Sequence, residues 1–137
     1  GIPYSTLAQE MRARGFDDNG TIISLEHELT GNLRQLFPNA TVIARAYPNF
    51  TPDGADWTRG RVAYVWDPQM SIKKAQSYLR FLLPKGIEAK DAELVRVPWQ
   101  HLWRETGYRT STWYLLIVEK GRKKRIVNTG RSNRLGL

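Results

Sequence analysis

The stretch Thr110-Ser-Thr-Trp-Tyr-Leu-Leu-Ile-Val-Glu119 decides the fold, because its inner residues are apolar in two alternating sets. Successive side chains of a β-strand point to opposite faces of the sheet. Both sets are apolar here: Trp113, Leu115 and Ile117 in the first, and Tyr114, Leu116 and Val118 in the second. A strand that is apolar on both faces is typical of the interior of a sheet. Residues 110–119 therefore predict a central strand.

Two shorter segments before it predict further strands. Residues 41–47 and 61–66 alternate in side-chain character and are rich in β-branched and aromatic residues. The residues between them, 48–60, contain the Pro, Gly, Asn and Asp that favour a loop. We expect the two strands to be antiparallel neighbours, joined by a loop that is long enough to have a function.

The C-terminal part of the chain predicts a hairpin. Residues 94–97 read as a short strand, and Pro98 suits the first turn of a short helix after it. The segment Lys120-Gly-Arg-Lys123 has turn character and leads into a last strand near residues 124–127. Residues 112–128 would then form a hairpin whose basic turn lies at one end of the sheet.

Helical periodicity predicts three helices. Thr6 and Gln9 have the spacing of a capping box, which begins a helix over residues 6–14. The clearest helix ends before Pro38, and Ser71 is a good N-cap for a third. The apolar stripes that predict these last two helices are Ile22, Leu25, Leu29, Leu33 and Leu36 in one, and Ile72, Ala75, Leu79 and Leu82 in the other.

This order of helices and strands predicts an α+β fold. Strands that are neighbours in the sequence favour antiparallel pairing, so we expect a mostly antiparallel sheet of about four or five strands. Two or three helices would pack on one face of it. A length of 137 residues fits a single domain.

Positive charge is concentrated at the end of the chain. Residues 1–119 carry 14 Lys+Arg and 13 Asp+Glu, whereas residues 120–137 carry seven Lys+Arg and no acid. The sequence thus divides into a neutral globular body, 1–119, and a basic hairpin end and C-terminal tail, 120–137. Such asymmetry indicates a polyanionic partner, most often nucleic acid. The basic residues that we expect to contact phosphates are Lys120, Arg122, Lys123, Lys124, Arg125, Arg131 and Arg134.

The composition excludes several classes of protein. No Cys is present, which excludes disulfide scaffolds, thiolate zinc sites and thiol nucleophiles. No apolar run approaches the roughly 20 residues of a membrane helix, and the first 20 residues lack the apolar region of a signal peptide. We therefore expect a cytoplasmic protein that does not span a membrane. No phosphate-binding loop or other cofactor motif is present in the sequence, so no cofactor is assigned.

One histidine suggests an enzymatic alternative. His101 precedes Glu105 by one helical turn, and Arg104 lies beside them. A histidine oriented by a carboxylate, with a cation nearby, is what metal-independent cleavage of RNA requires. Metal-independent ribonuclease toxins on small α+β folds are built from such sets, although a His–Glu pair on a helix is more often structural.

Metal-dependent cleavage has weaker support in the sequence. Asp67 and Glu88-Ala-Lys90 have the residue types of a metal-nuclease site. That site needs its second element on a strand, whereas residues 85–91 read as a loop. No metal ligands are assigned.

The loop over residues 48–60 offers a further contact with nucleic acid. Trp57 lies near Arg59 and Arg61, and an aromatic ring beside arginines can stack on an unpaired base. The plainer interpretation is that Trp57 anchors the loop to the core.

Three hypotheses about function follow from the sequence. The first is a protein that binds nucleic acid, RNA or DNA, through its basic C-terminal hairpin and tail. The second is a ribonuclease that uses His101. The third is a structural subunit of a larger assembly, such as a phage particle or a ribonucleoprotein, in which the charged end docks on a protein partner or on packaged nucleic acid.

Overall fold

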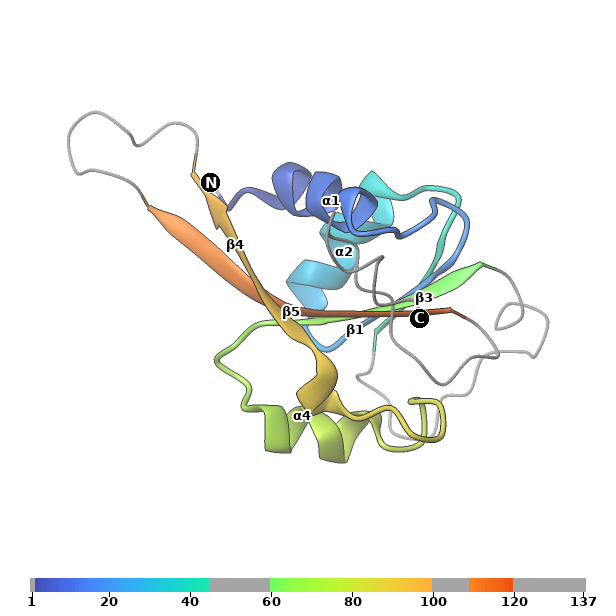
Figure 1. Cartoon of the computed structure of the whole chain (residues 1–137). Helices are drawn as coiled ribbons and strands as arrows, with labels where there is room; N and C mark the ends of the chain where they lie inside the picture. Colours follow the sequence, from blue (N-terminus) through green and yellow to red (C-terminus); the bar gives the residue numbers. More distant parts are fainter. Residues whose placement is uncertain (1, 45–59, 100–108, 120–137) are drawn as a thin grey trace, which may run out of the picture.

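The computed structural model describes residues 2–44, 60–99 and 109–119 of the chain. A five-stranded open sheet forms its centre, with helices on both faces (Figure 1). The elements are α1 (Tyr4–Ala13), β1 (Thr21–Ser24), α2 (His27–Leu36), β2 (Thr41–Ala44), β3 (Arg61–Trp66), α4 (Ile72–Leu79), the 3₁₀ turn η1 (Ala89–Asp91), β4 (Glu93–Pro98) and β5 (Thr110–Glu119).

The sheet is mixed, in the order β2-β1-β3-β5-β4. Strand β1 is parallel to both β2 and β3, and β5 is antiparallel to both β3 and β4. The α+β class, the five strands and the helix count agree with the expectation from the sequence. The expected antiparallel pairing of residues 41–47 with 61–66 is wrong, because β1 lies between β2 and β3 and runs parallel to both.

Strand β1 is the element that the sequence pattern concealed. Ile22 fits the apolar stripe of the second predicted helix, so that helix was expected to begin there. The structure instead buries Thr21, Ile22, Ile23 and Ser24 completely and begins α2 at His27. Three consecutive β-branched residues pack well in a strand and lose rotamer freedom in a helix. A buried strand has no alternation of polar and apolar residues that could reveal it.

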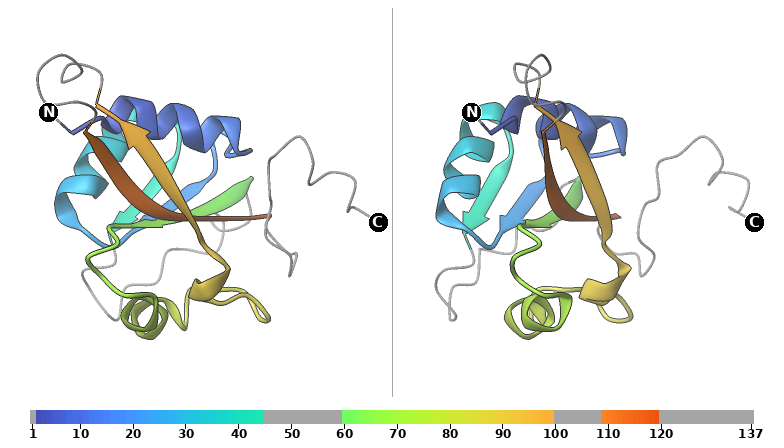
Figure 2. Two further views of the ribbon diagram at one scale, coloured as in Figure 1. Left: turned by 60° about the vertical axis from the view of Figure 1, so that its left-hand side comes forward. Right: turned by 90° about the vertical axis from the view of Figure 1, so that its left-hand side faces the viewer.

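Helices α1 and α2 lie on one face of the sheet and α4 on the other (Figure 2), and an apolar layer is buried on each face. Helices α1 and α2 bury Leu7 and Leu33 on one face, and α4 buries Leu79 on the other. The expectation that all helices lie on one face is therefore wrong. Strand β5 explains why, because Leu115 belongs to the first layer and Leu116 to the second. The prediction of a central strand over residues 110–119 is confirmed.

Two hydrogen bonds fix α4 and the turn after it. Ser71 caps the helix as predicted, since its hydroxyl accepts a hydrogen bond from the backbone N–H of Lys74 at 3.1 Å. Tyr64, buried on β3, donates its hydroxyl to the backbone carbonyl of Leu82 at 2.6 Å. The end of α4 is thus tied to the centre of the sheet.

Among the residues that the structure describes, no helix has the length and apolar composition needed to cross a membrane.

Candidate functional site

Most of the residues singled out by the sequence lie outside the described residues. The structure therefore does not test the predicted ribonuclease set, the loop residues or the last strand of the hairpin. The ribonuclease set consists of His101, Arg104 and Glu105, and the loop residues are Trp57 and Arg59. The hairpin end and tail contain all seven basic residues of 120–137.

Arg61 is the one predicted contact residue that the structure describes. Its side chain donates a hydrogen bond to the backbone carbonyl of Gly15, and its backbone N–H donates to Asp17 Oδ1 at 3.2 Å. Asp17 also lies close to Gly60, whose φ of 55° only glycine adopts readily. Arg61 thus joins the turn after α1 to the start of β3 by hydrogen bonds of its side chain and its backbone.

The residue types of a metal nuclease are not assembled here. Glu88 caps η1, a 3₁₀ turn rather than a strand, and its carboxylate lies 3.5 Å from Lys90 Nζ. Asp67 lines two cavities, and neither Glu88 nor Lys90 lines them with it. Within the described ranges, no group of three or more His, Asp or Glu side chains could hold a metal ion.

The structure reveals a different candidate site at the carboxyl ends of β1 and β3. The chain passes from β1 to β2 on one side, and β3 lies on the other side of β1, so the strand order reverses between β1 and β3. Ligands of open parallel sheets bind at such reversal points, outside the carboxyl ends of the strands. Glu26 follows β1 and Asp67 follows β3, so two carboxylates lie at this point.

The two carboxylates are held together by the backbone. The N–H of Asp67 donates to both carboxylate oxygens of Glu26, at 3.2 and 3.1 Å. Burial raises the pKa of Glu26 to about 7, which the Asp67 N–H opposes and the Asp67 carboxylate reinforces. A carboxyl group that titrates near neutral pH can both accept and donate a proton, as general acid–base chemistry requires.

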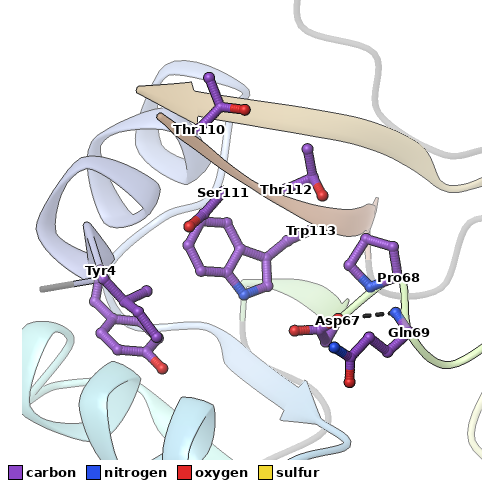
Figure 3. Close-up of a pocket in the computed structure, with 9 residues that line it drawn as sticks. Tyr4, Asp67, Pro68, Gln69, Thr110, Ser111, Thr112 and Trp113 are labelled. Atoms are coloured by element: carbon purple, nitrogen blue, oxygen red, sulfur yellow. Dashed lines mark hydrogen bonds between the residues drawn. The ribbon is translucent and has the colours of Figure 1, made fainter. Parts of the chain in front are cut away.

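Two cavities open at this point and share Asp67 and Gln69. The larger, about 470 Å³, lies between the rings of Tyr4 and Trp113 and the turn that follows β3 (Figure 3). In that turn, the backbone N–H of Gln69 donates to Asp67 Oδ1 at 2.8 Å. The smaller, about 290 Å³, is lined by Glu26 and Lys74 as well.

Tyr4 marks the electrostatic character of this site. Burial raises its pKa to about 12, with contributions from the carboxylates of Glu28, Asp67 and Glu26. Burial and three neighbouring carboxyl groups therefore keep this phenol protonated. We name Tyr4, Glu26, Glu28 and Asp67 the acidic crevice; its charge disfavours phosphate groups.

Basic residues collect on α4 and the turn after it. Between Asp67 and Glu88 the chain has no acid, but it has Lys73, Lys74, Arg80 and Lys85. All four are exposed, as is Phe81, whose ring has the Arg80 guanidinium 4.9 Å from its centre. The body that is neutral in total is thus divided into an acidic and a basic region.

Sequence reasoning missed both regions. The apolar stripe from Ile22 to Leu36 places Glu26 inside a predicted helix and so conceals its position after β1. The basic run around α4 was hidden by averaging charge over residues 1–119. The detectable signals are an acid within two residues of the end of each of two apolar segments, and an acid-free interval of twenty residues between Asp67 and Glu88.

No protein-family model matches the chain, and no curated protein or solved structure matches it either.

Proposed function

We propose that this protein binds nucleic acid through phosphate contacts of its basic C-terminal residues, 120–137. The observation that carries the proposal is the charge distribution: seven Lys+Arg and no acid lie in this segment, whereas the preceding 119 residues are nearly neutral. Phosphate contacts need positive donors in reach of the backbone and little further geometry.

The attachment of this segment supports the proposal. Residues 120–137 follow β5 directly, and β5 is an interior strand that pairs with β3 and with β4. Its last residue, Glu119, is in register with Arg61 at the start of β3. That end of β3 is opposite the end at which Asp67 lies. The last described residue before the basic segment, Glu119, therefore lies at the end of the sheet remote from the acidic crevice, whose charge would oppose phosphate binding.

Affinity of this kind depends steeply on salt. Each phosphate neutralised on duplex DNA contributes a slope of about 0.9 in log K against log salt concentration. Six or seven contacts would give a slope of roughly 5 to 6. Phosphate contacts position a protein without reading sequence, so we expect little base preference from this segment alone.

Fluorescence anisotropy with labelled single-stranded RNA, single-stranded DNA and duplex DNA at two salt concentrations tests the proposal. The test variant changes Arg122, Lys123, Lys124 and Arg125 to Gln and deletes residues 129–137. We expect it to lose binding at low salt and to keep the melting temperature of the parent. A matched control, Lys90→Gln, removes an exposed charge that is paired with Glu88 and should leave binding unchanged. Equal affinity of the parent and the test variant would overturn the proposal.

The same samples separate the two alternatives. RNA cleaved in EDTA, and left intact by His101→Ala, would replace the binding function with the ribonuclease that the sequence suggested. Absence of binding together with a defined oligomer in light scattering would favour the assembly subunit. Intact probe with salt-sensitive binding supports the proposal made here.

A further inference from the structure

We propose that the outer face of α4 is a stacking platform for the bases of single-stranded nucleic acid. We define the α4 outer face as Lys73, Lys74, Tyr78, Arg80, Phe81 and Lys85. This inference rests on the proposed function and adds a second contact surface to it, one that distinguishes single strands from duplex.

The centre of this surface is an aromatic ring in water. Phe81 is 85% exposed, and Tyr78, one helical turn before it, is 38% exposed. A single exposed apolar side chain is ordinary on a protein surface. Here the exposed ring also has the Arg80 guanidinium 4.9 Å from its centre. An aromatic ring with an arginine beside it is the combination that single-strand-binding surfaces use to hold bases and phosphates.

The four cations of the α4 outer face are exposed to solvent. Within the described part of the chain, none of Lys73, Lys74, Arg80 and Lys85 forms an ion pair with a carboxylate. The arginines of α1 and of the turn after it behave differently. Arg12 pairs with Asp18 at 2.8 Å, and Arg14 pairs with Glu93 at 2.8 Å and with Glu10. The four cations of the α4 outer face therefore differ from the arginines of α1 and of the turn after it, whose charges are paired within the protein.

The end of α4 and the turn after it carry these residues. Lys74 and Tyr78 are four residues apart on α4, which places them on one flank of the helix, and Phe81 follows in the turn after Leu79, the last residue of α4. The residues on the opposite side, Ala75 and Leu79, are fully buried against the sheet. Tyr78 and Phe81 are thus exposed on the side away from the core, and Lys74 lies where this surface meets the smaller cavity beside Glu26 and Asp67.

The backbone that carries Phe81 is fixed. The N–H groups of Leu82 and Leu83 both donate to the carbonyl of Leu79, at 2.7 and 2.9 Å. The carbonyl of Leu82 accepts the hydroxyl of Tyr64 at 2.6 Å. Phe81 therefore stands between two anchored residues, and its exposure does not result from fraying at the end of the helix.

This chemistry selects unpaired bases without reading their identity. A phenyl ring offers a π-face and no hydrogen bond, so any base can stack on it. The surrounding ammonium and guanidinium groups would hold the phosphates on either side. In a duplex the base faces are stacked on one another, so duplex DNA offers this ring nothing beyond its backbone charge.

The test uses the full chain and two single-stranded probes of equal length and charge. One is a labelled oligothymidylate of about 20 nucleotides, and the other is its abasic counterpart, which has the same phosphates and no bases. Phe81→Ala should weaken binding of oligothymidylate about fivefold to a hundredfold, the range of one base–aromatic contact, and leave binding of the abasic strand unchanged. Phe81→Trp should restore the affinity, since it keeps a stacking ring. The matched control is Leu94→Ala, which removes an exposed apolar side chain from β4.

The outcomes separate this inference from the proposed function. If the parent chain binds neither probe at low salt, the proposed function and this inference both fail. If the parent binds both probes and Phe81→Ala affects neither, or both equally, the stacking platform is refuted and the phosphate contacts of residues 120–137 remain. If Phe81→Ala instead weakens binding only to vesicles of phosphatidylserine and phosphatidylcholine, the surface contacts lipid and the inference is wrong.

Discussion

The two helical layers that cover the sheet treat their charges in opposite ways. On one face, the arginines of α1 and of the turn after it are paired within the protein: Arg12 contacts Asp18, and Arg14 contacts Glu10 and Glu93. On the other face, α4 presents Lys73, Lys74 and Arg80 to solvent without such pairs in the described chain. Both layers bury comparable apolar side chains on the sheet.

This difference teaches how one small domain separates stability from binding. Apolar packing holds both layers in place, so neither needs its surface charges for folding. Exposed ion pairs contribute little to stability in any case, typically 0 to about 1 kcal/mol. The charges of α4 are therefore available to an external partner, whereas Arg12 and Arg14 are neutralised by carboxylates of the protein itself.

The largest expected effect tests whether both layers are packed equally well. Leu33 on α2 and Leu79 on α4 are both 0% exposed. Leu33→Ala and Leu79→Ala should each lower the free energy of unfolding by about 2 to 5 kcal/mol, because each leaves a cavity in a full core. Urea denaturation followed by tryptophan fluorescence measures this. A loss below about 1 kcal/mol for Leu79→Ala alone would show that α4 is loosely held, and the equivalence of the layers would fail.

A smaller effect concerns the bond between the sheet and the end of α4. Tyr64→Phe removes the hydroxyl that the Leu82 carbonyl accepts and leaves that carbonyl without its partner. We expect a loss of about 1 to 3 kcal/mol in the free energy of unfolding. The amide N–H groups of Leu82 and Leu83 should also exchange hydrogen faster than in the parent. Unchanged exchange in Tyr64→Phe would mean that this bond does not fix the turn.

The smallest effect concerns the acidic crevice and depends on pH. Burial raises the pKa of Glu26 to about 7, above its ordinary value of 4.5. The folded state therefore binds the proton more tightly than the unfolded state does. Protonation of Glu26 therefore makes its whole contribution to the free energy of unfolding below about pH 4.5, and that contribution is lost as the pH rises through 7.

Glu26→Gln should abolish that dependence, because the amide oxygen can still accept the Asp67 N–H and carries no charge. We expect the variant to gain about 1 kcal/mol over the parent between pH 5 and pH 8, since Glu26 is only partly buried. Urea melts at both pH values measure the difference. Parallel pH profiles for the parent and the variant would contradict the assignment.

The sequence predicted elements whose signals are local. Ser71 and the apolar spacing behind it located α4, and the double apolar face of residues 110–119 located the central strand. The sequence did not predict elements that depend on partners distant in the chain. Ile22 satisfies a helical stripe, and only its pairing between β2 and β3 shows that it belongs to a strand. The meeting of Glu26 with Asp67 depends on the same parallel pairing, so the acidic crevice could not be predicted once β1 was missed.

The position of β5 has a consequence for how the chain folds during synthesis. β5 follows β4 and β3 in the chain, yet it lies between them in the sheet. Until the ribosome has delivered residues 110–119, β3 has an open edge of Val62, Tyr64 and their neighbours, and β4 has no partner. Unpaired strand edges of this kind are prone to aggregate. We therefore expect the nascent chain to remain dependent on chaperones until β5 emerges, and the sheet to close in one late, cooperative step.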